Sequence, residues 1–146
     1  MGGVDVAYLD FAKAFDTVSH PKLIQKLRAY GVSGNLLRWI ESFLIGRTHC
    51  VRIDGHTSTL CTVTSGVPQG SVIGPLLFLI YINDMPSVIA HSDIHIFADD
   101  SKLSFKVNNL EDKARLSEDL GKLFQWANVN QMSLALEKCA VTTYWS

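Results

Sequence analysis

Two adjacent carboxylates, Asp99 and Asp100, stand between an apolar segment and a segment in which apolar and polar residues alternate. This pattern predicts a strand, a tight turn and a second strand, with the Asp pair at the tip of the hairpin. Because Asp is common in turns, an ordinary hairpin turn is one interpretation. The other is a metal site, since neighbouring carboxylates repel unless one is neutralised and Mg²⁺ prefers carboxylate oxygen. A two-metal site would need a third carboxylate from elsewhere in the chain.

Asp10 is the candidate for that third carboxylate. It stands at the end of a segment, residues 4–11, whose composition predicts a strand. Neighbouring strands lie ~4.8 Å apart, so the ends of two strands could present Asp10 and the Asp pair to two cations ~3.5–4 Å apart. In such a site one metal lowers the pKa of an attacking hydroxyl and the other neutralises a phosphate leaving group.

The remaining sequence predicts alternating helices and strands. Helices are expected from Ser19 or His20 to Gly31, from Ser33 or Asn35 to Gly46, from Pro75 to Asp84 and from Leu110 to Val129, and strands at 50–53, 60–63 and 140–145. The third helix is apolar on most sides and is therefore expected to be buried. Between the second and third helices, Ser65–Ser71 predicts a loop that lets another group approach its backbone closely. The order of elements predicts an α+β fold, an antiparallel β-sheet with helices packed on one face.

Length and charge limit the classes of function. The 146 residues are one domain in length, residues 1–146, and the net charge of −1 excludes a bulk basic field for nucleic acid. Between positions 21 and 57 the chain has only two acidic residues, Glu41 and Asp54. The same segment has six basic residues, which are Lys22, Lys26, Arg28, Arg38, Arg47 and Arg52. This cluster could meet phosphates or be an ordinary solvated helix face.

Cysteine usage and hydropathy indicate the environment of the chain. The three cysteines, Cys50, Cys61 and Cys139, form no CxxC pair, and we expect reduced, buried or half-buried thiols of an intracellular protein. The start of the chain lacks the features of a signal peptide. The longest apolar run, Val72–Ile82, is shorter than the ~20 residues that span a bilayer, so no membrane partner is expected.

Three stretches in this order resemble motifs A, B and C of the reverse transcriptases of non-LTR (LINE-type, jockey-like) retrotransposons. They are Tyr8–Val18, Ser65–Ser71 with Gly74–Phe78, and Phe97–Asp100. The resemblance covers nearly the whole chain. It implies a partial reverse transcriptase domain, the polymerase palm with motifs A to D, with fingers and thumb largely absent. The activity it implies is RNA-templated DNA synthesis, a nucleotidyl transfer by a two-metal mechanism.

The resemblance also assigns the metal site and an acid. Asp10 and Asp99 would be the main Mg²⁺ ligands, helped by the Phe11 carbonyl, with Asp100 as a supporting carboxylate, and Mn²⁺ can substitute. Lys138 stands where motif D has a lysine proposed to protonate the pyrophosphate leaving group, and a lysine ammonium of ordinary pKa ~10.4 can act as a general acid at neutral pH. The family commonly has Asn three residues earlier, where this chain has Ala135, so a plain surface lysine stays the alternative.

The nucleotide-binding residues follow from the same resemblance. Phe15 would be the steric gate that excludes a ribose 2′-hydroxyl, and its alternative is a core aromatic. Gln69, followed by Gly70, would lie against the incoming nucleotide and the template, although a Gln in a turn is usually solvated. Ala98 would contact the primer end. Asp16 lies beyond the predicted strand and is interpreted as structural.

The expected partners are an RNA template, a DNA primer, deoxynucleoside triphosphates, and the fingers, thumb and endonuclease regions of the same element. The expected location is intracellular, in cytoplasm and nucleus. A catalytically silent retroelement remnant, acting at most as a nucleic-acid or protein-binding module, is the alternative function. An RNA-templated RNA polymerase is disfavoured by Ala98 and Phe15. Absent fingers and thumb should leave apolar helix residues exposed, with Leu36, Leu37, Trp39 and Phe43 as candidates.

Overall fold

The computed structural model describes residues 2–145 of the chain. It divides them into two compact units, one made of residues 2–14 and 82–145 and the other of residues 15–81. The single domain expected over residues 1–146 stays a prediction. No helix within residues 2–145 combines the length and the apolar character needed to cross a bilayer.

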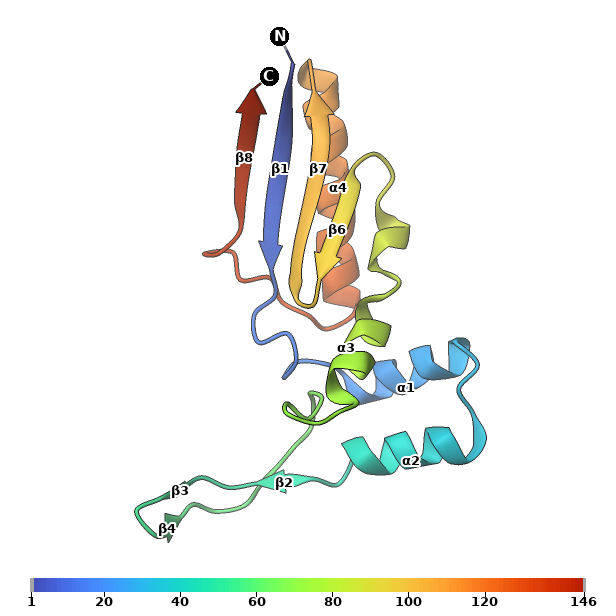
Figure 1. Cartoon of the computed structure of the whole chain (residues 1–146), viewed down its shortest axis with the longest axis vertical. Helices are drawn as coiled ribbons and strands as arrows, with labels where there is room; N and C mark the ends of the chain where they lie inside the picture. The colour runs from blue at the N-terminus through green and yellow to red at the C-terminus, as the bar shows by residue number, and fades with distance from the viewer. Residues whose placement is uncertain (1, 146) are drawn as a thin grey trace. The chain divides into compact units, whose positions relative to one another are not determined.

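The first unit is built on a four-stranded antiparallel sheet with the strand order β6-β7-β1-β8. Its strands are β1 (Gly3–Asp10), β6 (Asp93–Phe97), β7 (Asp100–Val107) and β8 (Ala140–Trp145). Figure 1 shows β1 between β7 and β8, with helix α4 (Leu110–Val129) along one face of the sheet. The α+β prediction, an antiparallel sheet with a helix on one face, is confirmed for this unit.

The two-residue period of β1 decides which of its side chains form the core. Ala7 and Leu9 are buried, whereas Tyr8 between them is exposed. From α4 the helical spacing contributes Leu116 and Leu123 to the same core. Val6, on the same face as Tyr8, is also buried, so one face of the strand packs in the core and the other is only partly open to solvent.

A buried carboxylate joins α4 to the chain segment that leads into β6. Asp119 is fully buried on α4, and its two oxygens accept hydrogen bonds from the backbone amides of Ala90, His91 and Ser92 at 2.9, 2.9 and 2.7 Å. Burial raises the pKa of Asp119, but these hydrogen bonds outweigh burial and hold the pKa below its ordinary value. This clamp fixes the connection between the 3₁₀ helix η1 (Met85–Val88) and β6.

The second unit contains three helices and a two-stranded arm. The helices are α1 (His20–Ala29), α2 (Gly34–Leu44) and α3 (Gly74–Ile82). Pro21 in the first turn and Gly31 (φ 88°) after the last turn delimit α1 as predicted. Lys26 of α1 donates a hydrogen bond to the Tyr81 carbonyl at 2.6 Å, and its ammonium lies 4.8 Å from the centre of the Tyr81 ring. These contacts tie α1 to α3.

The arm is the hairpin predicted around Asp54 and Gly55, with shorter strands than expected. Its strands are β2 (Thr48–His49), β3 (Arg52–Ile53), β4 (His56–Thr57) and β5 (Cys61–Thr62), paired β2 with β5 and β3 with β4. Every side chain from residue 48 to 62 is exposed, and Figure 1 shows the arm extending away from α2. The prediction of buried or half-buried thiols is therefore wrong for Cys50 and Cys61, because no second layer covers the arm, whereas Cys139 is half-buried.

Two further burial predictions need correction. In α3, Phe78 and Tyr81 are buried, but Leu76 and Leu79 are 56% and 47% exposed, so the helix is not buried on most sides. In α2, Leu36 and Trp39 are exposed as expected and Phe43 is half-buried. Leu37 is buried instead, because it shares one helix face with Ile40 and Leu44.

We predict that Asp119→Asn lowers the free energy of unfolding by about 1–3 kcal/mol at pH 7, because the buried charged acceptor of three backbone amides is lost. The folded-state pKa lies below the unfolded one, so this contribution is present above about pH 4, falls as the pH drops through the folded-state pKa, and is then lost. Urea denaturation at pH 7 and pH 3 measures both effects. Glu118→Gln, an exposed neighbour, is the control, and an equal loss in both variants would contradict the clamp.

Candidate active site

The structure places two of the predicted carboxylates directly opposite each other. Asp10 ends β1, Asp100 begins β7, and the two residues are partners in the β1–β7 register. The Asp10 carbonyl accepts a hydrogen bond from the Ala135 amide at 2.9 Å, on the edge of β1 away from β7. Asp10 and Asp100 therefore form a non-hydrogen-bonded pair, in which Cα atoms lie ~4.5 Å apart and side chains approach closely. The predicted meeting of the two strand ends is confirmed.

Asp99 lies in the two-residue turn that joins β6 to β7. Phe97 pairs with Asp100, which leaves Ala98 and Asp99 as the loop of the hairpin. Ala98 has φ 52°, the left-handed backbone that such loops need at their first position and that normally favours glycine. The turn thus brings Asp99 to the same end of the sheet as Asp10. The prediction that both carboxylates lie at the tip of the hairpin is wrong for Asp100, which pairs with Phe97, begins β7 and lies directly opposite Asp10.

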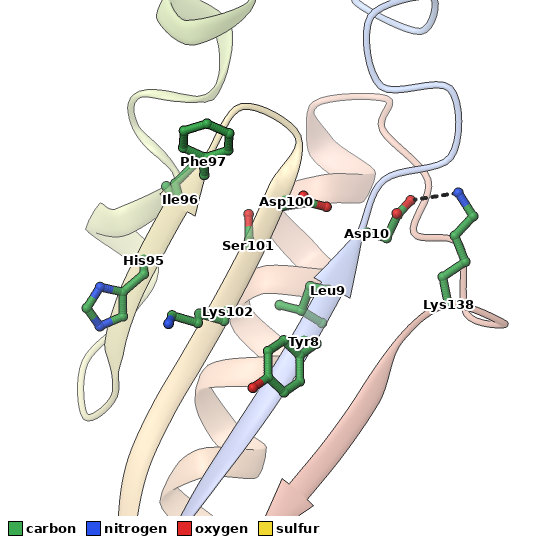
Figure 2. Close-up of a pocket in the computed structure, with 10 residues that line it drawn as sticks. All are labelled: Tyr8, Leu9, Asp10, His95, Ile96, Phe97, Asp100, Ser101, Lys102 and Lys138. Atoms are coloured by element: carbon green, nitrogen blue, oxygen red, sulfur yellow. Dashed lines mark hydrogen bonds and ion pairs between the residues drawn. The ribbon is translucent and has the colours of Figure 1, made fainter.

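Lys138 reaches Asp10 from the segment between α4 and β8. Its Nζ lies 3.5 Å from Asp10 Oδ1, as the dashed line in Figure 2 shows. The backbone places it there, because the Ala135 amide binds the Asp10 carbonyl and the Lys138 amide binds the Ala135 carbonyl at 2.8 Å. Any residue except proline can supply the amide at this position, and Ala135 supplies it here.

The Phe11 carbonyl also lies at this strand end. Phe11 forms an antiparallel bridge with Leu134, and the flanking hydrogen bonds use the Asp10 carbonyl and the Ala12 amide. Successive carbonyls of a strand point to opposite edges. The Phe11 carbonyl is therefore directed toward the β7 edge of β1, the side on which Asp100 lies.

A cavity of about 420 Å³ adjoins these groups on the first unit. Figure 2 shows the side chains that line it, which are Tyr8, Leu9, Asp10, His95, Ile96, Phe97, Asp100, Ser101, Lys102 and Lys138. The predictions missed Tyr8, His95 and Lys102. Each stands two residues before or after a residue of the strand ends, namely Tyr8 before Asp10, His95 before Phe97 and Lys102 after Asp100, so all lie on the sheet face of Asp10 and Asp100. The two-residue period of a strand could have identified them.

The donor types of this site suit a divalent cation. Two opposed carboxylates and a carbonyl are hard oxygen ligands, which Mg²⁺ prefers. Within residues 2–145, however, no group of three or more His, Cys, Asp or Glu side chains is arranged to hold a metal ion. The role of Asp99 as a main ligand therefore stays a prediction.

The second unit holds three of the predicted nucleotide-binding residues, and the fourth, Ala98, lies in the first unit. Phe15, Gln69 and Gly70 line a cavity of about 210 Å³ together with Pro68, Gly74 and Pro75. The Phe15 ring stacks on Phe78 with centroids 4.3 Å apart and an interplanar angle of 28°. Phe15 is half-buried, so it contributes a core contact and a wall of the cavity at once.

The glycine-rich loop approaches the backbone of the segment around Phe15, as predicted. Val67 donates to the Phe15 carbonyl at 2.9 Å and Gly66 to the Val18 carbonyl at 2.8 Å. Gly66 has φ 87°, and a Cβ at this position would lie 2.8 Å from the Asp16 carbonyl oxygen. Only glycine fits there, both for its backbone conformation and for the close approach.

Comparison with known proteins decides the family. Residues 5–145 match the model of the family "Reverse transcriptase (RNA-dependent DNA polymerase)". The chain belongs to the reverse transcriptase family. It is 36% identical over 146 residues to the RNA-directed DNA polymerase from the mobile element jockey of Drosophila melanogaster, covering 94% of this chain. It is also 36% identical over 125 residues to a probable RNA-directed DNA polymerase from transposon X-element of the same organism, covering 82% of this chain.

This reverse transcriptase-family chain spans only 16% and 14% of the lengths of those two relatives. Among solved structures, telomerase from Candida Tropicalis in complex with a fragment of telomeric RNA superposes with a TM-score of 0.74 at 12% identity, covering 98% of this chain and 26% of that one. An apo telomerase from the same organism gives 0.73 at 11% identity, covering 100% and 32%. These likenesses agree with the predicted polymerase-palm fold.

We predict that Ala98→Gly stabilises the chain by up to about 1 kcal/mol, because it removes the cost of a left-handed backbone at a residue with a Cβ. Urea denaturation monitored by circular dichroism measures the change. The same substitution at the exposed Ala114 of α4 should destabilise by about 1 kcal/mol, because glycine is a poor helix former. A loss of stability in both variants would show that the Ala98 backbone is unstrained.

We predict that Gly66→Ala destabilises the chain by more than Gly70→Ala. Both glycines have positive φ, 87° and 78°, and replacing either costs about 1–3 kcal/mol for that reason. A Cβ at Gly66 also meets the Asp16 backbone, whereas one at Gly70 meets no atom within 4 Å. Thermal unfolding of both variants measures the difference, and equal losses would contradict the close approach of the loop.

Proposed function

We propose that this chain carries the nucleotidyl-transfer site of an RNA-directed DNA polymerase. The reaction is the extension of a DNA primer on an RNA template with deoxynucleoside triphosphates. The direct opposition of Asp10 and Asp100, with Lys138 at 3.5 Å from Asp10, is the observation that carries the proposal. The match of residues 5–145 to the reverse transcriptase family also supports the proposal.

Asp10, Asp99, Asp100 and the Phe11 carbonyl would hold Mg²⁺, for which Mn²⁺ can substitute. Bound divalent cations supply a lowered pKa for the attacking primer 3′-hydroxyl and charge neutralisation at the leaving pyrophosphate. The opposed Asp10 and Asp100 would supply anionic oxygen ligands to these cations.

Lys138 would act as the general acid. The bond between the α-phosphorus and the bridging oxygen breaks as the primer oxygen attacks, and the pyrophosphate oxygen then gains negative charge. The exposed Lys138 ammonium would donate a proton to this oxygen, which makes pyrophosphate a better leaving group.

Four residues would select and position the nucleotide and the primer end. The Phe15 ring, held by its stacking on Phe78, would leave no room for a ribose 2′-hydroxyl and so favour deoxynucleotides. Gln69 and Gly70 line the same cavity as Phe15 and would lie against the nucleotide and template. Ala98, with its small side chain in the turn, would leave space for the primer end.

The complete reaction would need more of the element than this chain. A polymerase holds a duplex largely through phosphate contacts, and a net charge of −1 equips the chain poorly for them. We infer that fingers and thumb of the same element supply the remaining contacts, alongside an endonuclease region. Reverse transcription of an element's RNA would place the protein in the cytoplasm and the nucleus.

We predict that the folded chain binds Mn²⁺ and that Asp10→Asn or Asp99→Asn weakens this binding at least tenfold, because each substitution removes an anionic oxygen ligand. Isothermal calorimetry measures the affinity. Asp93→Asn, an exposed carboxylate at the far end of β6, is the matched control and should bind as the unmodified chain does. In the complete reading frame of the element, Asp10→Asn should abolish extension of a DNA primer on an RNA template.

Two results of the Mn²⁺ titration would contradict the proposal. A folded chain that binds no Mn²⁺, or that binds it equally well in all variants, would exclude a metal site at the end of β1. The catalytically silent remnant, a nucleic-acid or protein-binding module, would then be the better description.

A further inference from the structure

The side-chain amide of Gln69 has a defined orientation in the second unit. Its Nε2 donates a hydrogen bond to Asp16 Oδ1 at 2.8 Å. A carboxylate oxygen only accepts, so the NH₂ group of Gln69 must face Asp16 and its carbonyl oxygen must face elsewhere. The Asp16 carboxylate, which can only accept, therefore distinguishes Nε2 from Oε1 in the Gln69 amide.

The backbone of Asp16 is fixed by the glycine-rich loop, Ser65–Ser71. Its carbonyl accepts a hydrogen bond from Ser65 Oγ at 2.8 Å, and its backbone lies against Gly66. The Asp16 and Gln69 side chains are both exposed, and Gln69 precedes Gly70, where an added Cβ would meet no atom within 4 Å. A glutamine side chain without a partner at such a place loses its fixed rotamer, because ordering it costs conformational entropy.

Gln69 is also a wall of the 210 Å³ cavity that Phe15 lines. With the NH₂ group directed to Asp16, the remaining strong hydrogen-bonding group is Oε1, which has two acceptor lone pairs. Of the two ends of the amide, Oε1 is therefore the one left for a ligand in the cavity, and it would pair with a hydrogen-bond donor of that ligand.

We propose that Asp16 is a positioning residue, which holds the Gln69 amide so that Oε1 accepts a hydrogen bond from the bound nucleotide. The donor is a sugar hydroxyl or a base N–H. Asp16 itself does not touch the nucleotide. The inference rests on the proposed function, because it needs a deoxynucleotide in this cavity.

A charge-conserving pair of substitutions separates positioning from mere structure. Gln69→Glu places two carboxylates where the hydrogen bond was, which breaks the pair. Adding Asp16→Asn restores a hydrogen bond with the donor and acceptor exchanged, and it returns the net charge to that of the unmodified chain. An oxygen at position 69 again faces the ligand.

The experiment measures binding of dTTP with Mn²⁺ to the full 146-residue chain by calorimetry. We expect Asp16→Ala to weaken binding about fivefold, the worth of one hydrogen bond, and Gln69→Glu to weaken it at least tenfold. The double variant, Asp16→Asn with Gln69→Glu, should recover to within about twofold. Asp54→Asn, in the exposed turn of the arm, removes one negative charge away from the cavity and should bind unchanged.

A dideoxynucleotide identifies the donor. If the effect of Asp16→Ala disappears with the 3′-deoxy analogue, the donor is the sugar hydroxyl, and if it persists, the donor is on the base. If Asp16→Ala and Gln69→Glu bind as the unmodified chain does, or if the double variant binds as poorly as Gln69→Glu, the inference is wrong.

A second readout does not depend on nucleotide. The side-chain NH₂ signals of Gln69 in a nitrogen–proton NMR spectrum should be dispersed in the unmodified chain and collapse to the position of a free glutamine in Asp16→Ala. If they do so while no variant binds dTTP, the proposed function fails and the Asp16–Gln69 contact stands. If the signals are unaffected by Asp16→Ala, the positioning role itself is refuted.

Discussion

The pairing of β1 with β7 is the constraint on which the rest of the candidate site depends. The eight pairs from Gly3–Val107 to Asp10–Asp100 form one register, so each carboxylate is placed by all the pairs before it. A slip of one residue would turn every β1 side chain to the other face. Burial of Ala7 and Leu9 in the core resists this slip. The hydrophobic effect in the core thereby sets the position of polar groups at the strand end.

The chain reversal after α4 completes the site. Gln131 has φ 56°, and the Met132 amide binds the Ala127 carbonyl at 2.9 Å, which ends the helix in a left-handed turn. The next residues run back to the end of β1, where Ala135 binds the Asp10 carbonyl and Lys138 reaches Asp10. A T-shaped contact between the Phe11 and Trp126 rings, with centroids 6.3 Å apart, supports the same junction. Lys138 and the carboxylates are thus positioned largely by backbone contacts.

In the second unit, too, backbone contacts fix the segments around the cavity. Backbone hydrogen bonds from Gly66 and Val67 fix the glycine-rich loop to the segment that carries Phe15. Side chains then complete the arrangement, with Phe15 stacked on Phe78 and Gln69 bound to Asp16. A loop held through its backbone tolerates no Cβ at Gly66, which explains why glycine is needed there whatever the ligand is.

The sequence by itself determined the local elements and the family. The bounds of α4, residues 110–129, the strand at 140–145 and the hairpin turn next to Asp99 follow from periodicity and turn chemistry, which act over a few residues. Only the tertiary structure decided that Asp100 lies opposite Asp10, because register depends on pairs far apart in the chain. It also decided the Asp16–Gln69 bond and the exposure of Cys50 and Leu76. Local patterns specify which face of an element is apolar, but the packing of distant elements decides what covers that face.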